Sequence, residues 1–327
     1  MTSNPATAAA PAVGSGAKTL VMTGGTSGFG RRMVMRLLAE KPDWRVFLLA
    51  RSPEKAADIM QLPGAQGRLT IVTADLASLK SVAKAADSIE AALGGQRIDA
   101  MAFNAGLQAI LTDQASAEGI ELSFAVNHLA HYLLAERLLP RVRDGGRLVL
   151  TSSIVHNPET YCVVGITRAT WEDPAIMADA AKAQDHMKER VDRGEARYSA
   201  SKLLNLMHAR HLAKAVPRVA TLAFNPNIVP GTEIARERNI FQILGWKYIM
   251  PLMAPVLPTV RTQDTSAGDL LWLVTEADAG KFSGQYLDGR QPMPGSDESR
   301  DAAKIARVIE VSDALLAKHG FKASAQR

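Results

Sequence analysis

The sequence predicts an α/β fold in which a doubly wound, parallel sheet of seven strands forms a single domain. From Lys18 onward, short apolar runs alternate with longer amphipathic runs, a pattern typical of βαβ units. The length of 327 residues fits one such domain with insertions. Neither an internal repeat nor a Gly/Ser-rich or Pro-rich linker divides the middle of the chain. We therefore expect one domain over residues 18–327, preceded by a flexible tail at residues 1–17.

The period of the apolar residues predicts the individual elements. Short apolar runs predict strands at 19–22, 45–50, 69–73, 100–103, 147–151, 219–224 and 285–287. Apolar residues at three- and four-residue spacing predict helices near 28–40, 53–61, 79–93, 117–139, 197–215 and 263–275, and a C-terminal helix near 297–319. Crossovers between parallel strands are right-handed, so we expect helices on both faces of the sheet.

Two long segments depart from this alternation. Residues 156–196 separate a strand from the next helix by far more than a usual βα loop, and they carry many charges, so we expect an insertion there. Residues 226–262 include large apolar side chains from Phe241 to Met253 that the sheet cannot entirely cover. We expect this segment to be a lid over a bulky apolar ligand, with plain packing or contact with a membrane surface as alternatives.

The composition excludes several classes of protein. Hydrophobic residues make up 47% and charged residues 22% of the chain, which excludes disorder and a coiled coil. The single cysteine, Cys162, excludes a disulfide scaffold and a cysteine-rich zinc cage, and it favours the cytoplasm. The net charge of +5 is small and scattered, which favours a phosphorylated small molecule over a nucleic acid as partner. The sequence contains no run of 18 apolar residues, so we expect no transmembrane segment. We expect a monomer or a homo-oligomer.

A glycine-rich loop follows the first predicted strand. It reads Thr23-Gly24-Gly25-Thr26-Ser27-Gly28-Phe29-Gly30 and leads into a helix. Glycines allow a tight turn and a close approach to a pyrophosphate, whose charge is attracted by the free amides of a helix N-terminus. Glycines also form plain turns and caps, but the position after a strand favours a dinucleotide site. We expect its phosphate-binding residues to be Gly24, Thr26, Ser27, Gly28, Phe29 and Gly30.

The end of the second strand indicates which dinucleotide binds. An acidic residue there would accept hydrogen bonds from the adenosine ribose, but the chain has Arg51. An arginine can stack on adenine and contact a 2′-phosphate, so we expect NADP(H) rather than NAD(H), with a solvated loop residue as the alternative. After the third strand, Asp75 and Leu76 are expected either to contact the adenine or to precede a helix as an ordinary N-cap.

A tyrosine and a lysine four residues apart carry the predicted chemistry. Tyr198 and Lys202 lie in a predicted helix, where this spacing puts both side chains on one face. A free tyrosine has a pKa of about 10, and a neighbouring lysine cation and a nicotinamide charge would lower it toward the working range. The pair then acts as a proton donor and acceptor, although this spacing alone is more common in surface pairs.

The order of all these motifs resembles the short-chain dehydrogenase/reductase family over about residues 18–289. Besides the glycine loop and the Tyr198–Lys202 pair, the shared features are Asn104-Ala105-Gly106, Asn127, Ser152-Ser153 and Pro226. The resemblance implies a Rossmann fold and catalytic roles for four residues: Ser153 polarises the substrate oxygen, Tyr198 is the general acid or base, Lys202 holds the nicotinamide ribose and Asn127 holds a water. Ser152 is the less favoured serine. It also implies cofactor contacts from Asn104, Ala105, Gly106, Pro226, Val229 and Thr232.

Within that family the chain is most similar to retinol dehydrogenases and light-dependent protochlorophyllide reductases. The similar stretches are 151–156, 198–205 and 229–232, and more loosely 303–312. Asn227 departs from the pattern, because the family usually has a glycine after this proline. The resemblance implies an NADP(H)-dependent oxidoreductase that interconverts an alcohol and a carbonyl on a bulky apolar substrate. One alternative is a reductase of carbon–carbon double bonds, in which Tyr198 or Cys162 protonates carbon, and another is a non-catalytic NADP-binding regulator.

Two histidine pairs have a spacing that a metal site could use. His128 and His131, like His208 and His211, lie three residues apart in predicted helices. No acidic or cysteine partner accompanies either pair in the sequence. We therefore expect no metal, and we expect Cys162 to be a small buried side chain unless it acts as a proton donor in the reductase alternative.

Overall fold

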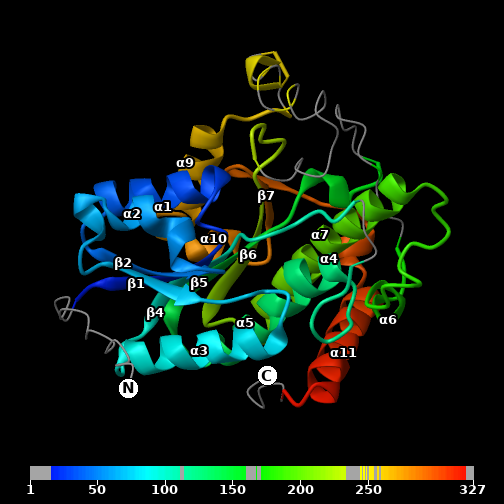
Figure 1. The fold of residues 1–327 in the computed structure, drawn as a ribbon, viewed down its shortest axis with the longest axis horizontal. Coiled ribbons are helices and arrows are strands. Elements are labelled where there is room, and N and C mark those ends of the chain that lie inside the picture. Colours follow the sequence, from blue (N-terminus) through cyan, green and yellow to red (C-terminus); the bar gives the residue numbers. More distant parts are fainter. Residues whose placement is uncertain are drawn as a thin grey trace, which may run out of the picture.

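The computed structural model describes residues 16–110, 114–159, 167, 171–232, 244, 246, 248, 250–253, 256–257 and 259–321. Its centre is one sheet with the strand order β3-β2-β1-β4-β5-β6-β7-β8 (Figure 1). The chain builds outward from β1, first to β2 and β3 on one side and then to β4 and its successors on the other, as the doubly wound prediction requires. The strands are β1 (Lys18–Thr23), β2 (Trp44–Ala50), β3 (Leu69–Thr73), β4 (Ile98–Phe103), β5 (Val142–Thr151), β6 (Val219–Asn225), β7 (Tyr286–Asp288) and β8 (Gln291–Met293).

The described sheet has eight strands, so the predicted number of seven is wrong by one. All neighbouring strands are parallel except β7 and β8, which form an antiparallel pair. The turn between them contains Gly289 at φ 61°. All three residues of β8 are exposed and one is a proline, so the sequence there carries no apolar alternation that would indicate a strand.

Helices cover both faces of the sheet, as predicted. One face, the upper one in Figure 1, carries α1 (Gly28–Glu40), α2 (Ala57–Met60), α9 (Gln263–Thr275) and α10 (Ala279–Phe282). The other face carries α3 (Leu79–Leu93), α5 (Ala130–Leu138), α7 (Arg190–Ala215) and α11 (Ala302–Lys318). Alternate residues of a strand serve the two cores: Leu20 and Met22 of β1 pack with α1, whereas Val21 packs on the opposite side.

The helix predicted near 117–139 is shorter and more irregular than expected. It comprises α4 (Leu122–Phe124), a π-helical segment (Ala125–Leu129) and α5. A π-helical turn inside an α-helix is rare and is frequently found at functional sites. The predicted helix at 53–61 is likewise a 3-10 turn (Pro53–Ala56) followed by α2.

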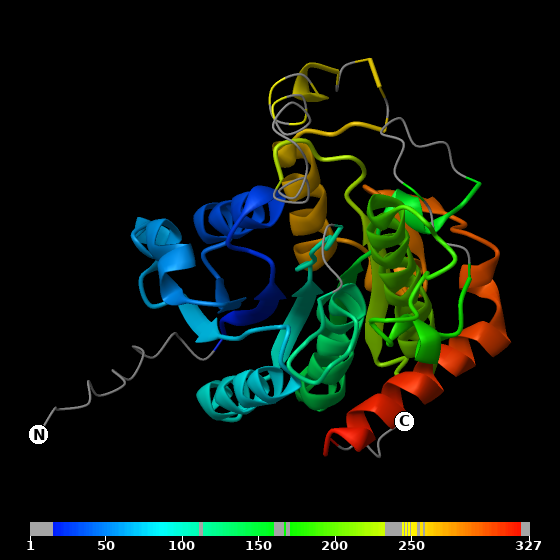
Figure 2. The same ribbon diagram turned by 45° about the vertical axis from the view of Figure 1, so that its right-hand side comes forward.

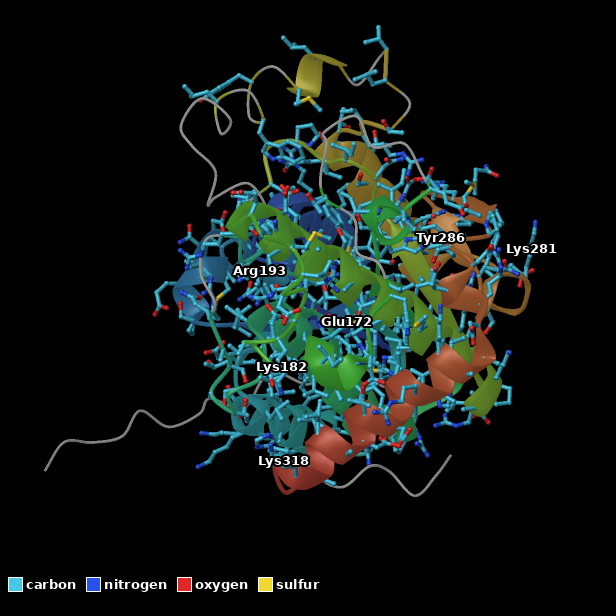
Figure 3. The ribbon with its side chains drawn as sticks, turned by 90° about the vertical axis from the view of Figure 1, so that its right-hand side faces the viewer. Glu172, Lys182, Arg193, Lys281, Tyr286 and Lys318 are labelled. Atoms are coloured by element: carbon cyan, nitrogen blue, oxygen red, sulfur yellow. The ribbon has the colours of Figure 1, made fainter. Side chains whose placement is uncertain are left out.

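The predicted insertion is shorter than expected, because α7 begins at Arg190 and not near 197. The many charges of residues 156–196 favoured an insertion over that whole range, but the structure packs the start of α7 tightly: a Cβ on Gly194 would lie 2.4 Å from the Cα of Ile110. The preceding segment includes α6 (Pro174–Met177), and Arg307 of α11 donates to Asp173 at 2.8 Å. Figure 3 views this side, with α11 in red below the segment that carries Glu172, Lys182 and Arg193.

Residues of the expected lid project beyond the sheet. Much of 233–258, like Cys162 and the tail at 1–15, lies outside the described residues. The described parts of 244–257 lie above the carboxyl ends of the strands in both views (Figures 1 and 2). Trp246, Met250 and Leu257 pack against a small apolar cluster that contains Tyr198, while Leu244, Tyr248, Leu252 and Val256 are exposed. Across the described ranges, no helix combines the length and the apolar character needed to cross a membrane.

Candidate active site

A cleft with a volume of about 190 Å³ opens at the carboxyl ends of β1, β4, β5 and β6. The cleft includes the point between β1 and β4 where the strand order reverses, which is the usual ligand position in doubly wound folds. The predicted site residues that line it are Gly24, Ser27, Gly28, Phe29, Gly30, Asn104, Ala105, Gly106, Ser153, Tyr198, Lys202, Pro226, Val229 and Thr232.

The glycine loop has the geometry of a tight strand-to-helix turn. Gly24 has φ 68°, and a Cβ there would lie 2.5 Å from the backbone nitrogen of Ala105. A Cβ on Gly30 would lie 2.0 Å from the carbonyl oxygen of Gly24. Ser27 precedes α1 without a side-chain capping bond, and the first turn of α1 contains no acidic residue. The first amides of α1 can therefore attract an anion.

The ends of three strands are joined across the bottom of the cleft by Asn104. Its Nδ2 donates to the carbonyl oxygen of Gly24 at 2.9 Å, and its Oδ1 accepts from Thr151 Oγ1 at 3.0 Å. The side chain thus connects the loop after β4 to the glycine loop after β1 and to the end of β5. The sequence predicted Asn104 as a cofactor contact, and its bonds also fix the shape of the cleft.

Tyr198 and Lys202 share one face of α7 and are both almost fully buried. Lys202 Nζ lies 5.5 Å from the centre of the Tyr198 ring and donates to the carbonyl oxygen of Thr151 at 3.2 Å. Burial lowers the pKa of Lys202 to about 8. Burial also raises the pKa of Tyr198 well above its usual value, and a hydrogen bond with Ser153 opposes this only in part. In the protein without coenzyme, desolvation therefore raises the pKa of Tyr198, whereas the expected lowering also required the charge of a nicotinamide.

The two neighbouring serines after β5 differ in their surroundings. Ser152 is buried, and its hydroxyl donates to the backbone oxygen of Lys202 at 2.8 Å, which ties β5 to α7. Ser153 is half-buried and close enough to Tyr198 to lower the pKa of the phenol. The next residue is held by Asn225 of β6, whose Oδ1 accepts from the backbone of Ile154 at 3.1 Å. A phenol, an ammonium group and a hydroxyl beside one cleft can together move a proton and hold a substrate oxygen.

Asn127 lies behind the cleft, in the π-helical segment. Its Oδ1 accepts from the backbone nitrogen of Leu107 at 2.8 Å, and its Nδ2 donates to the Leu107 carbonyl and to Ser201 Oγ, both at 2.9 Å. Both the oxygen and the nitrogen of the Asn127 side chain are thus hydrogen-bonded to other groups of the protein. The structure therefore positions Asn127 as a brace for the chain after Gly106.

Four predicted cofactor residues do not line this cleft among the described residues: Thr26, Arg51, Asp75 and Leu76. Arg51 is exposed at the end of β2. Asp75 accepts from the backbone of Ala77 at 3.0 Å, and the N-cap of α3 is Ser78, so the expectation of an ordinary N-cap at Asp75 is wrong. Leu76 packs against the large apolar core on the α3 side of the sheet and against a small cluster formed by Ala109, Leu122 and Val126.

The loop after β6 returns to the glycine loop. Thr232 lies beside Gly28, where a Cβ would be 3.2 Å from the threonine Cγ2. Asn227, which replaces the usual glycine, has φ 66°, and its Nδ2 donates to Asp288 Oδ1 at 3.0 Å. Asparagine is one of the few residues other than glycine that adopt this conformation readily, which accounts for the departure.

Sequence reasoning missed several residues of the cleft wall. Leu107 and Gln108 directly follow the predicted stretch 104–106, and Ile154 follows Ser153, so their positions beside known motifs are a signal that could have found them. Trp246 lies within the stretch from Phe241 to Met253 that was expected to cover a bulky apolar ligand, although no local signal singled it out within that stretch. The remaining unpredicted wall residues are Thr151, Val155, Asn227 and Ile228, together with Ser152, the less favoured serine.

Comparison with known proteins finds a dehydrogenase family and reductase relatives. A family described as short chain dehydrogenase matches residues 18–163. A relative from Streptomyces sp. (strain C5) that bears the name of a daunorubicin C-13 ketoreductase is 29% identical, over 91% of this chain and 92% of that protein. A protochlorophyllide reductase of Chlamydomonas reinhardtii is 26% identical, over 91% of this chain and 78% of that protein.

Solved structures share the fold. NADPH-bound carbonyl reductase from chicken fatty liver superimposes with a TM-score of 0.61 at 19% identity, over 85% of this chain and 98% of that one. An uncharacterised protein from Mycobacterium Paratuberculosis has a TM-score of 0.64 at 21% identity, over 92% of this chain and 93% of that one. The family match over residues 18–163 and the reductase relatives over most of the chain support an oxidoreductase that is similar to short chain dehydrogenases and related to protochlorophyllide reductases.

Proposed function

We propose that this protein is an NADP(H)-dependent reductase or dehydrogenase that interconverts a carbonyl and an alcohol on a bulky apolar substrate. The observation that carries the proposal is that Ser153, Tyr198 and Lys202 line the same cleft as the glycine loop. The name of the Streptomyces relative, a ketoreductase, supports the same class of reaction.

The proposed chemistry divides between the coenzyme and the protein. A bound nicotinamide dinucleotide supplies or accepts the hydride. Tyr198 donates its phenolic proton to the carbonyl oxygen in the reducing direction, because its raised pKa keeps it protonated at neutral pH. Ser153 holds the same oxygen by a hydrogen bond. Lys202 contacts the coenzyme ribose and, as a cation, stabilises the phenolate left after the proton has moved.

The proposed preference for the phosphorylated coenzyme rests on Arg51. The neighbouring cations of α1 are engaged: Arg31 pairs with Asp58, and Arg32 pairs with Asp264 at 2.8 Å. The exposed Arg51 forms no ion pair within the described part of the chain. Its guanidinium group at the end of β2 therefore remains available for a 2′-phosphate.

The substrate class follows from the wall of the cleft. Apolar side chains from three segments face it, namely Leu107, Ile154, Val155, Ile228, Val229 and Trp246. Such a wall favours a large apolar molecule whose polar group reaches Tyr198. We extend the proposal to a lid role for the segment that carries Trp246, to a single folding domain over residues 18–327, and to a cytoplasmic monomer or homo-oligomer.

The second candidate function is reduction of a carbon–carbon double bond in a tetrapyrrole. It is favoured by the protochlorophyllide reductases among the relatives. The two candidates differ in their need for light. Purified protein is incubated with NADPH or NADH and with aryl ketones, steroids, retinoids or tetrapyrroles, in light and in darkness, while absorbance of the reduced coenzyme is followed.

We expect NADPH oxidation in darkness with at least one bulky ketone and none with Tyr198→Phe. Turnover of a tetrapyrrole only under illumination supports the second candidate. Tight NADPH binding without any oxidation across the panel would refute both and support the non-catalytic regulator.

A further inference from the structure

His131 is a buried histidine of α5 that the proposed mechanism does not use. It is fully inaccessible, and its ring stacks on that of Phe103, with centroids 5.1 Å apart and planes 9° from parallel. Phe103 is the last residue of β4, directly before Asn104. The stacking fixes the plane of the imidazole beside the loop that lines the cleft.

Both ring nitrogens of His131 lie at hydrogen-bond distance from groups around the cleft. Nε2 is 2.9 Å from Thr23 Oγ1, and Nδ1 is 2.9 Å from the carbonyl oxygen of Asn127. Thr23 Oγ1 also accepts from the backbone nitrogens of Asn104 and Ala105, both at 3.1 Å. One histidine thus connects the end of β1, the loop after β4 and the π-helical segment.

The donors and acceptors allow one arrangement of protons. Two backbone amides occupy the acceptor positions of the Thr23 hydroxyl, so its single proton must point to His131. Nε2 is therefore an acceptor, and the ring proton lies on Nδ1, from which it is donated to Asn127. Burial and the charge of Lys202 lower the pKa of His131 to about 4, which agrees with a neutral ring.

We propose that His131 is a positioning residue of the coenzyme site: it turns the Thr23 hydroxyl so that this oxygen holds both amides of the Asn104–Ala105 turn. Through Asn127, it also fixes the segment whose side-chain amide braces Leu107. This role rests on the proposed coenzyme site. A ring that cannot accept at Nε2 leaves the Thr23 proton without its partner and loosens the turn against which the coenzyme lies.

His128 provides a matched control in the same helical region. It is also fully buried, but its Nε2 lies 2.9 Å from Ser312 Oγ of α11. The Ser312 hydroxyl donates to the Val308 carbonyl, so His128 is its donor and holds the C-terminal helix. Replacing either histidine removes a buried imidazole, but only His131 contacts the coenzyme site.

The test measures the Kd of NADPH by its fluorescence, together with the Tm of each protein. We expect His131→Leu to raise the Kd about tenfold or more, equivalent to about 1.4 kcal/mol. His131→Gln offers an oxygen near the position of Nε2 and should stay within about threefold of the wild type, whereas His131→Asn keeps only the Asn127 bond and should resemble His131→Leu. His128→Leu should lower the Tm and leave the Kd unchanged.

A double-mutant cycle with Thr23→Val separates the shared bond from general packing. If both residues act through this bond, His131→Leu should add little to the Kd of Thr23→Val. Equal losses of Tm in His131→Leu and His128→Leu, with both Kd values at the wild-type level, would overturn the proposal, and so would a Gln variant as weak as the Leu variant. Failure of the wild type to bind NADPH or NADH would refute the coenzyme site itself, and the role of His131 with it.

Discussion

Lys202 is buried as a cation, and its replacement by methionine should make the protein without coenzyme more stable. The side chain is 2% exposed, and burial lowers its pKa from 10.5 to about 8. At pH 7 Lys202 is therefore still charged in the folded state, although the charged form has a lower free energy in water than at this buried position. Methionine has a similar length and no charge, so Lys202→Met removes this cost.

The magnitude follows from the change in pKa. A downward change from 10.5 to about 8 corresponds to about 3 kcal/mol of destabilisation below pH 8. Methionine loses the hydrogen bond from Nζ to Thr151, but that carbonyl keeps its bond from Asn205 at 3.1 Å. We expect a net gain of about 2 kcal/mol in the free energy of unfolding at pH 7, since a hydrogen bond contributes about 1 kcal/mol.

The sign of the pH dependence provides the sharper test. Between pH 8 and 10.5 the unfolded state binds more protons than the folded state, so the wild type gains stability as the pH rises. Lys202→Met has no such group, and its advantage over the wild type should shrink by about 2 to 3 kcal/mol across this range. Urea unfolding at pH 7 and 10.5 measures the difference.

The exposed Lys84 of α3, replaced by methionine, serves as the control and should show no comparable change. A Lys202→Met protein that is less stable than the wild type at pH 7, or an advantage that does not shrink with pH, would refute the reasoning. The variant should also have lost turnover, which separates the stability of this site from its activity.

Three further predictions concern the site. Tyr198→Phe should lower kcat by at least about a hundredfold with NADPH affinity nearly unchanged, because only the proton donor is lost; a wild-type rate would remove Tyr198 from the mechanism. Arg51→Ala should raise the Kd of NADPH about tenfold and that of NADH little, since only the former carries the 2′-phosphate; equal losses would contradict the coenzyme preference. Asn227→Val should lower the free energy of unfolding by about 1 to 2 kcal/mol because of its φ of 66°, whereas Asn227→Gly should be tolerated in thermal unfolding; equal effects would show that the conformation is not the constraint.

Local sequence patterns predicted much of the fold for a physical reason. A buried parallel strand must be apolar on both faces, so β1, β2 and β6 stand out as short apolar runs. The glycine loop can be predicted from the sequence for a similar reason, because a side chain at Gly24 or Gly30 would collide with the backbone. Exposed elements lack such a pattern. The strand β8 was missed because none of its three side chains is buried.

What the sequence by itself determined is the order of the strands and helices along the chain and the spacing of Tyr198 and Lys202 on one helix face, because both depend on local period. Only the tertiary structure decided the surroundings of those groups. Burial, which sets the pKa of Lys202 and of Tyr198, is created by residues far away in the chain. The pairing of Thr23 with His131, 108 residues apart, is likewise a product of packing β1 against α5, and no local pattern encodes it.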